Sequence, residues 1–383
     1  MCLLTLCLLL PVADPSLPAG WTAAAPRDEL RPAIVFDPAG GPKKTGAFVF
    51  TADGRDGLHG WVEKAFPVTG GKHYHVHAVR KATDVAVPRR SAVVRVRWTD
   101  DAGKAVPMSE PPVAGYLKGY AGPAEPEHPT DKGTDPAGWT EVSDTYRAPA
   151  KATRAVVELH FLWAPNGRVE WADAGVTEVP APAPRTVRLA TVHFRPSGKS
   201  PAANREEFAP LVAEAARQKA DLVVLGETLT FINTGKSYAD CAEPVPGPST
   251  RYFGELARKH NLYVVAGLLE RDGHLVYNVA ALIGPDGGLI GKYRKVCLPR
   301  GEIERGVAPG SEYPVFDTRF GKVGLMVCYD GFFPEVAREL ANRGAEVIGW
   351  PVWGCNPGLA AARACENHVY LVSSTYRTCP GTG

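Results

Sequence analysis

The chain has 383 residues and a net charge of +2, from 43 basic and 41 acidic side chains, so its charge gives no basis for binding nucleic acid. Its length is sufficient for two domains, each with a core of its own. The eight cysteines follow no disulfide framework and include no Cys-x-x-Cys metal motif.

Residues 2–12 form an apolar run that is too short to span a bilayer as a helix. Such a run is typical of the hydrophobic region of a secretory signal. We therefore expect residues 1–25 to be a signal peptide-like segment. The protein would then be exported to the periplasm, the cell envelope or the medium.

Residues 26–178 consist of short apolar or alternating runs between turns rich in Gly, Pro and Asp. The clearest runs lie at 46–50, 73–79, 92–98, 155–163 and 169–171. Such strands without a helical pattern predict an all-β sandwich. The segment around Trp139 and the apolar strand after it resemble jelly-roll carbohydrate-binding-like modules. This resemblance implies a glycan partner, which would need exposed aromatic residues such as Trp61 or Tyr116. A position of these aromatic residues in the core is the alternative.

Three histidines, His73, His75 and His77, share one face of the strand predicted over 73–79. Three imidazoles on one face could bind a metal ion, but no carboxylate or fourth ligand lies nearby in the sequence. We favour a half-exposed strand face, and we expect no metal site in this protein.

The proline-rich segment 179–185 predicts an extended linker, and strands alternate with helices over residues 186–383. This alternation predicts an α/β layered domain with a largely buried sheet. Strands are expected at 187–194, 221–225, 262–269, 275–283, 289–295, 323–327, 347–349 and 369–375. Helices are expected at 204–219, at 250–260 with Ser249 as N-cap and Asn261 at the C-terminal end, from Pro334 to a stop at Gly344, and at 359–367.

Three strand ends in this domain carry reactive side chains. Cys328 follows the apolar run 323–327, Glu227 follows the run 221–225, and Lys295 ends the run 289–295. A cysteine at such a position is commonly a small buried hydrophobe, and Glu or Lys at a strand end is commonly solvated. Together, however, the three supply a nucleophile, a base and a cation. A thiol of ordinary pKa needs such a base, and charge that develops during attack on a carbonyl needs such a cation.

The three segments resemble the nitrilase, or carbon–nitrogen hydrolase, superfamily over residues 187–375. The matching motifs are Gly226-Glu227, Tyr293-Arg294-Lys295 with Leu298-Pro299, and Cys328-Tyr329-Asp330 with Phe333-Pro334-Glu335. The resemblance implies an α-β-β-α fold and an amidase-type hydrolase of non-peptide C–N bonds. It also implies a Glu227, Lys295 and Cys328 triad, a thioester acyl-enzyme and no cofactor.

Further site residues follow from the same resemblance. The family carries a second glutamate after the lysine, for which Glu302 and Glu304 compete, and the spacing to Pro309 favours Glu304. The backbone N–H of Tyr329 would help Lys295 to stabilise the developing charge. Trp350 and Trp353 are candidates for the pocket lining, or alternatively core residues.

The resemblance also sets expectations for partners and substrates. It implies a small amide substrate and a possible homodimer, and Gly331-Phe332 lacks the arginine that some carboxylate-binding members carry there, which disfavours an acidic substrate. The family's catalytic domain normally continues beyond residues 369–375, so we expect this domain to be partial. A non-catalytic secreted protein that binds a glycan or a partner, with an inert hydrolase domain, is the alternative function.

Overall fold

The computed structural model describes residues 17–110, 118–120, 122–354 and 356–376. Most of the expected signal segment, and Tyr116, lie outside these residues. The chain divides into two compact units, residues 1–183 and 184–383, each of which is described by itself. No helix in the described ranges is long and apolar enough to cross a membrane.

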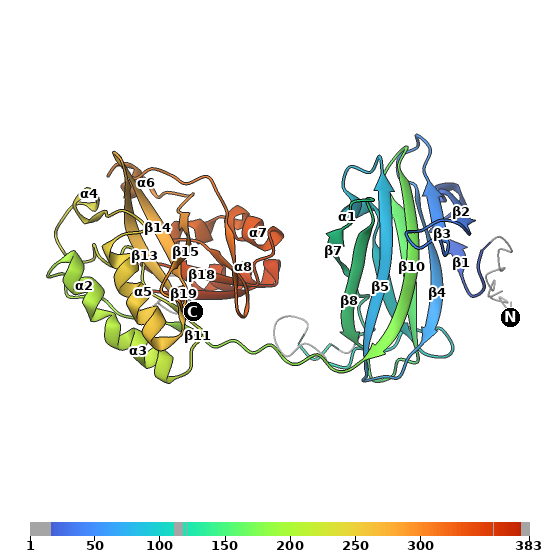
Figure 1. Ribbon diagram of the computed structural model, residues 1–383, viewed down its shortest axis with the longest axis horizontal. Coiled ribbons are helices and arrows are strands. Elements are labelled where there is room, and N and C mark those ends of the chain that lie inside the picture. The colour runs from blue at the N-terminus through green and yellow to red at the C-terminus, as the bar shows by residue number, and fades with distance from the viewer. Residues whose placement is uncertain (1–16, 111–117, 121, 355, 377–383) are drawn as a thin grey trace, which may run out of the picture. The chain divides into compact units, whose positions relative to one another are not determined.

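The first unit consists of two antiparallel sheets around one hydrophobic core (Figure 1). In strand order, the smaller sheet contains β1 (Thr22–Ala24), β4 (His59–Pro67), β9 (Arg154–Leu162) and β6 (Val94–Thr99). The larger sheet contains β2 (Ala33–Asp37), β3 (Ala47–Thr51), β10 (Arg168–Val179), β5 (His73–Thr83), β8 (Thr140–Arg147) and β7 (Thr130–Thr134). Two short helical turns, η1 (Asp28–Leu30) and α1 (Pro88–Ser91), interrupt the strands. The five apolar runs noted in the sequence fall on β3, β5, β6, β9 and β10.

Strand β5 shows how alternation builds this unit. Tyr74, Val76 and Ala78 are buried in the core, whereas the three histidines between and beside them are half-buried on the other face. The rings of His75 and His77 stack with their centroids 5.8 Å apart. Within the described residues, no group of three or more His, Cys, Asp or Glu side chains is arranged to hold a metal ion.

The second unit has two sheets. The first, in strand order, contains β11 (Leu189–Thr191), β12 (Leu222–Val224), β13 (Tyr263–Asp272), β14 (Leu275–Ile283) and β15 (Leu289–Arg294). The second contains β16 (Val315–Thr318), β17 (Gly321–Leu325), β18 (Val347–Pro351) and β19 (Tyr370–Ser374). The helices are α2 (Pro201–Glu207), α3 (Ala209–Arg217), α4 (Tyr238–Cys241), α5 (Pro248–His260), α6 (Arg300–Ile303), η2 (Cys328–Phe332), α7 (Pro334–Asn342) and α8 (Pro357–Asn367).

These elements form α-β-β-α layers. One apolar cluster lies between the two sheets, where Val265 of β13 and Ile348 of β18 both contribute to it. A second cluster joins the outer face of the first sheet to helices α3 and α5, and Leu340 of α7 packs on the second sheet. Figure 1 shows α2, α3 and α5 on one side of the strands and α7 with α8 on the other. The predicted layered fold of this half is therefore confirmed.

Local structure departs from the sequence prediction at two helices. In place of the single helix expected over 204–219, the structure has α2 and α3, which Phe208 separates. The helix is interrupted because Pro210 has no N–H to donate to the carbonyl of Glu206. Helix α5 begins at Pro248, so Ser249 lies inside it and is not its N-cap. The C-cap residue of this helix, Asn261, adopts φ +51°, the left-handed conformation of a helix end, as the sequence predicted.

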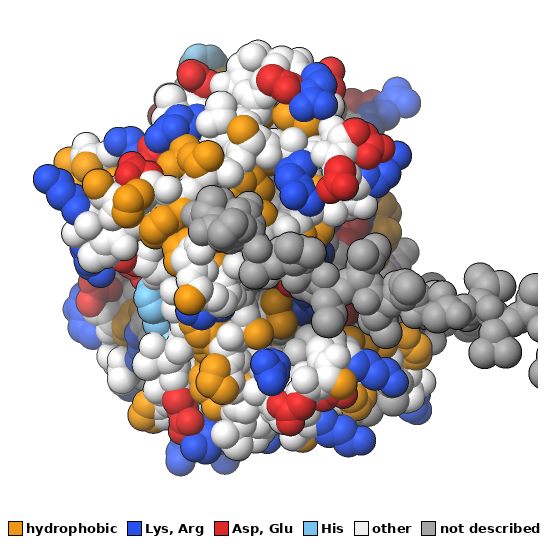
Figure 2. Space-filling model, turned by 90° about the vertical axis from the view of Figure 1, so that its right-hand side faces the viewer, with side chains coloured by type: hydrophobic (Ala, Val, Ile, Leu, Met, Phe, Trp, Pro, Cys, Tyr) orange, Lys and Arg blue, Asp and Glu red, His pale blue; other side chains and the backbone are white. Residues whose placement is uncertain are grey.

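Acidic and basic side chains are interspersed on the face of the molecule that Figure 2 presents. Figure 2 shows no extended area of a single sign on the face that it presents. This distribution agrees with the near-zero net charge of the chain.

Candidate active site

Glu227 is placed by a close contact between backbones after β12. A Cβ atom on Gly267 would lie 2.4 Å from the carbonyl oxygen of Gly226, and one on Gly226 would lie 2.4 Å from the ring of Tyr376. Only glycine allows both approaches. The Tyr376 hydroxyl donates a 2.7 Å hydrogen bond to the carbonyl of Glu227. The carboxylate that follows Gly226 is therefore held in the interior, with 1% of the residue exposed.

Lys295 joins Glu227 to a second carboxylate. Its Nζ lies 3.0 Å from Oε1 of Glu227 and 2.6 Å from Oε1 of Glu302, and the lysine is fully buried. Asn278 Nδ2 donates to Glu227 Oε1 at 2.8 Å and to Glu302 Oε1 at 3.2 Å. Charged groups this deep in a protein require such pairing. Glu227 Oε2 is also buried, yet it has no hydrogen-bond partner within the described residues.

The charges in this cluster follow from burial and proximity. Burial alone would lower the pKa of Lys295, but the negative charges of Glu227 and Glu302 outweigh it, and the net pKa lies above the ordinary value. Lys295 is therefore an ammonium at neutral pH. Burial raises the pKa of Glu302, although Lys295 opposes that rise.

Cys328 is the first residue of η2, beyond the end of β17. Its φ of +42° is a conformation that residues other than glycine seldom adopt, and such strain is often found at functional sites. Asp330 fixes the turn, because its Oδ2 accepts from the Val327 N–H at 2.8 Å and from the Tyr293 hydroxyl at 2.9 Å. Its Oδ1 accepts from the Cys297 N–H at 2.8 Å, which ties the cysteine turn to the segment after Lys295.

Two of the triad candidates, Glu227 and Cys328, line one pocket of about 240 Å³, and the third, Lys295, contacts Glu227 and Glu302 of its wall. The full lining is Glu227, Tyr238, Pro299, Gly301, Glu302, Arg305, Cys328 and Trp353. Burial raises the pKa of the Cys328 thiol, and the negative charge of Glu227 raises it further. Lys295 and the backbone N–H of Trp353 partly offset this rise. The resting thiol is therefore protonated at neutral pH and needs a base.

Of the two candidates for the second glutamate, Glu302 contacts Lys295 and Glu304 does not. The side chain of Glu304 is 59% exposed and pairs with Arg300 at 2.7 Å. The two glutamates are two positions apart on the α6 turn, which corresponds to a rotation of about 200°, so only one can point inward. The spacing to Pro309 does not reveal which way each side chain points. The sequence favoured Glu304, whereas the structure places Glu302 at Lys295.

The two tryptophan candidates have different surroundings. Trp353 lines the pocket and donates from Nε1 to Thr228 Oγ1 at 3.2 Å. Trp350 is 1% exposed in the core between the sheets, outside the pocket lining, and its Nε1 donates to the Cys328 carbonyl at 3.1 Å. Tyr329 follows the nucleophile candidate in η2, where the first N–H groups have no partner inside the helix.

Three further site residues were missed from the sequence. Asn278 is a polar residue within an apolar strand, 1% exposed, and that was a usable signal. Tyr238 and Arg305 lie on a short helix and on a turn. Neither carries a local pattern that points to the pocket.

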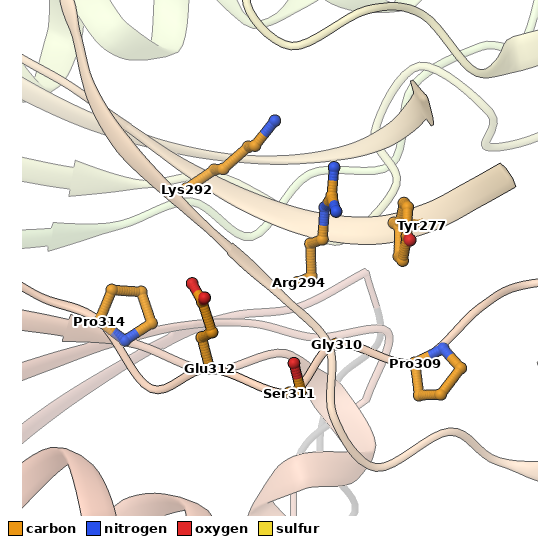
Figure 3. A pocket seen from close by; sticks show the side chains of 8 residues that line it. All are labelled: Tyr277, Lys292, Arg294, Pro309, Gly310, Ser311, Glu312 and Pro314. Atoms are coloured by element: carbon orange, nitrogen blue, oxygen red, sulfur yellow. The ribbon is translucent and has the colours of Figure 1, made fainter. Parts of the chain in front are cut away.

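A second hollow of about 300 Å³ lies beside β15 (Figure 3) and is lined by Tyr277, Lys292, Arg294, Pro309, Gly310, Ser311, Glu312 and Pro314. Its cations are already paired with the buried Glu270, which contacts Lys292 and lies 2.7 Å from Nε of Arg294. Figure 3 shows the Arg294 guanidinium beside the ring of Tyr277, and the centroid distance is 3.9 Å. None of the triad candidates lines this hollow, so it is not the candidate active site.

Residues 188–382 match the family model of the carbon-nitrogen hydrolases. The chain is 40% identical over 196 residues to a nitrilase of Pyrococcus abyssi, in an alignment that covers 49% of this chain and 74% of that protein. It is 34% identical over 207 residues to the omega-amidase NIT2 of Mus musculus, covering 50% and 74% of the two chains. A crystal structure of Saccharomyces cerevisiae Nit3 aligns with a TM-score of 0.46 and 27% identity over 51% of this chain and 78% of that one.

The chain belongs to the carbon-nitrogen hydrolase family. The family match occupies its C-terminal half, in agreement with the sequence resemblance. The prediction of an enzyme that hydrolyses C–N bonds other than peptide bonds is confirmed. The comparisons give no support to the alternative of a non-catalytic binding protein.

Proposed function

We propose that the protein is an amidase-type hydrolase in which Cys328 is the nucleophile, Glu227 the general base and Lys295 the electrostatic stabiliser. The observation that carries this proposal is the buried cluster in which Lys295 bonds both Glu227 and Glu302 beside the pocket that Cys328 enters. The relatives named a nitrilase and an omega-amidase support C–N bond hydrolysis.

In the first step the substrate amide carbon lies next to the Cys328 sulfur. Glu227 accepts the thiol proton on Oε2, for which the described residues offer no hydrogen-bond partner. The sulfur then bonds to the carbon, and the carbonyl electron pair moves onto oxygen. Lys295 and the N–H of Tyr329 stabilise that oxyanion.

In the second step Glu227 returns its proton to the amide nitrogen, the C–N bond breaks and ammonia leaves a thioester on Cys328. Glu227 next takes a proton from water, and the resulting hydroxide attacks the thioester carbon. The C–S bond breaks, the thiol recovers its proton, and a carboxylic acid is released. The sum is amide plus water giving acid plus ammonia, without a cofactor.

The proposal is tested by ammonia release from a panel of simple amides by Cys328→Ala and Glu227→Gln. Each variant should lose at least about 10³-fold in kcat, because nucleophile and base act as one unit. Cys365→Ala is the matched control, since that free cysteine is exposed and away from the pocket. Near wild-type turnover by either catalytic variant would refute the mechanism.

Alkylation provides a second readout that does not depend on turnover. Because burial raises the pKa of the Cys328 thiol, iodoacetamide at pH 7 should modify it quickly only when Glu227 can take the proton. In Glu227→Gln the rate at pH 7 should fall, because no base accepts the thiol proton, and it should then increase as the pH rises. Exposed Cys365 serves as the internal reference for labelling.

For the first unit, we propose a jelly-roll-like sandwich that binds a glycan. Successive strands from β3 to β6 alternate between the two sheets, which supports the jelly-roll arrangement. Trp163 is 51% exposed, and the half-buried ring of Trp61 stacks on His160 at 5.1 Å on the face away from the core. Trp61→Ala with Trp163→Ala should abolish retention on an insoluble polysaccharide, and unchanged retention or none by the wild type would reject the proposal.

We also propose export and homodimerisation. Residues 2–12 support export, which cell fractionation of the full-length chain tests directly. Exposed Phe332 and Phe333 beside the cysteine turn support a pairing surface near α7. Light scattering of the purified protein should give twice the chain mass, and a monomer mass at micromolar concentration would reject the dimer.

A further inference from the structure

The hollow beside β15 has cations on one wall and a carboxylate on the other. Its near wall consists of Lys292 and Arg294 of β15 and Tyr277 of β14, and its far wall is the loop 309–314 (Figure 3). The volume of about 300 Å³ is at the lower end of the range for small-molecule sites. None of these residues lines the pocket of Cys328, so the hollow is a separate cavity.

The two cations of the near wall are held in place by the buried Glu270. This carboxylate is 2% exposed, contacts Lys292, and accepts from Nε of Arg294 at 2.7 Å and from Nη2 at 3.0 Å. The Arg294 guanidinium also lies 3.9 Å from the centroid of the Tyr277 ring. A ligand therefore does not have to immobilise either cation, and such preorganisation favours binding.

Each cation keeps donors that no described residue uses. Lys292 has three N–H groups, of which two are accepted by Glu270 and by the Val245 carbonyl at 2.9 Å. Arg294 bonds Glu270 and Asp272 through Nε and Nη2, which leaves both N–H groups of Nη1. Asp272 is 61% exposed, so solvent screens its charge. The near wall can therefore still donate to an anionic group.

The far wall carries an acceptor without a partner. Ser311 and Glu312 are exposed, and neither side chain makes a hydrogen bond or an ion pair within the described ranges. Figure 3 shows the oxygen atoms of both side chains pointing from the loop toward β15. The loop is fixed there, because the Gly310 N–H donates to the Lys295 carbonyl at 2.8 Å and a Cβ atom on Gly310 would lie 2.2 Å from the carbonyl oxygen of Arg294.

The charges of the two walls determine which ligand fits. Lys292 and Arg294 with the single carboxylate of Glu270 leave the near wall with a net charge of +1, and Glu312 gives the far wall −1. A simple anion would suit the near wall but face Glu312, and a simple cation would suit Glu312 but face the two basic groups. A molecule with a carboxylate at one end and an ammonium at the other satisfies both walls through charge-assisted hydrogen bonds.

We propose that this hollow binds a small zwitterionic amino acid. Its carboxylate accepts from Lys292 and Arg294, and its ammonium donates to Glu312 and to the Ser311 hydroxyl. The site lies outside the pocket of Cys328, and the proposal does not depend on the catalytic mechanism.

The test is isothermal titration calorimetry of the full-length protein with three kinds of probe at millimolar concentrations. Glycine and γ-aminobutyrate carry both charges, acetate carries only the negative charge, and methylamine carries only the positive charge. The preferred amino acid should bind at least about 10-fold more tightly than acetate or methylamine, as expected for an additional hydrogen bond between charged groups.

Variants of the far wall locate the ligand. Glu312→Gln should weaken amino-acid binding roughly 10- to 100-fold without weakening acetate binding, because only the ammonium contacts that side chain. Glu312→Lys adds a third cation and should reverse the preference, so that succinate binds more tightly than either amino acid. Glu304→Gln is the matched control, since it changes an exposed glutamate outside the hollow, and it should leave every affinity unchanged.

A further variant separates the hollow from the candidate active site. Arg305→Ala removes the arginine that lines the pocket of Cys328 and should leave amino-acid binding unchanged. A loss of binding in Arg305→Ala would place the ligand in that pocket and overturn the proposal. Equal affinities for the amino acids and acetate, an unchanged affinity in Glu312→Gln, or no binding by the wild type would also overturn it.

Discussion

The clearest prediction concerns the two glutamates on the α6 turn. Glu302 accepts a 2.6 Å bond from the buried Lys295 and lies within 3.4 Å of Asn278 Nδ2 through both oxygens. Glu304 is largely exposed and contacts Arg300 at 2.7 Å. Glu302→Gln and Glu304→Gln are therefore a matched pair that differs in the direction of one side chain.

The expected magnitudes follow from these contacts. A hydrogen bond to a charged group contributes about 1.5–3 kcal/mol to stability. Glu302→Gln should therefore lower the free energy of unfolding by about 2 kcal/mol. If the stabilisation of the transition state decreases by the same amount, kcat/KM falls roughly 30-fold. The same loss lowers Tm by roughly 4–8 °C in a domain of this size. Surface ion pairs contribute about 0–1 kcal/mol, so Glu304→Gln should change kcat/KM by less than about twofold.

The assay is ammonia release under steady-state conditions, with thermal unfolding followed by circular dichroism on the same preparations. Equal losses in the two variants, or a larger loss in Glu304→Gln, would show that the side-chain directions described here are wrong. A fall in Tm without a fall in kcat/KM would restrict Glu302 to a structural role.

The remaining predictions concern the residues that position the site. Asp330 is buried, which raises its pKa from 3.8 to about 6, although its hydrogen bonds oppose the rise. The folded state therefore binds the carboxyl proton of Asp330 more tightly than the unfolded state does. The stability that this proton contributes is present below about pH 4 and is lost as the pH rises through 6. The unfolding free energy of the wild type relative to Asp330→Asn should fall by up to about 3 kcal/mol over that interval in denaturant titrations, and a pH-independent difference would contradict this. Asn278→Leu removes a hydrogen bond that lowers the pKa of Glu302, so the acid limb of the pH profile of kcat/KM should move to higher pH, whereas an unmoved limb would exclude a positioning role for Asn278.

The sequence by itself determined the layered half and the three triad candidates. Apolar runs that end in a charged or sulfur-bearing residue, punctuated by Gly and Pro, are local patterns and depend on no distant contact. This is why Glu227, Lys295 and Cys328 could be chosen together, and why the end of α5 at Asn261 was predicted correctly. The helix over 204–219 was placed as one element because its apolar stripe outweighed the effect of Pro210.

Only the tertiary structure decided which neighbouring side chains reach the pocket. Helix α6 has four residues, too few for a periodic pattern to reveal its inner face, so Glu302 could not be separated from Glu304. Trp350 and Trp353 are both bulky apolar residues, and only packing places one in the core and the other at the pocket. Tyr238 reaches Arg305 from a helix that is 67 residues earlier in the chain, and no local signal reports a contact formed by folding over that separation.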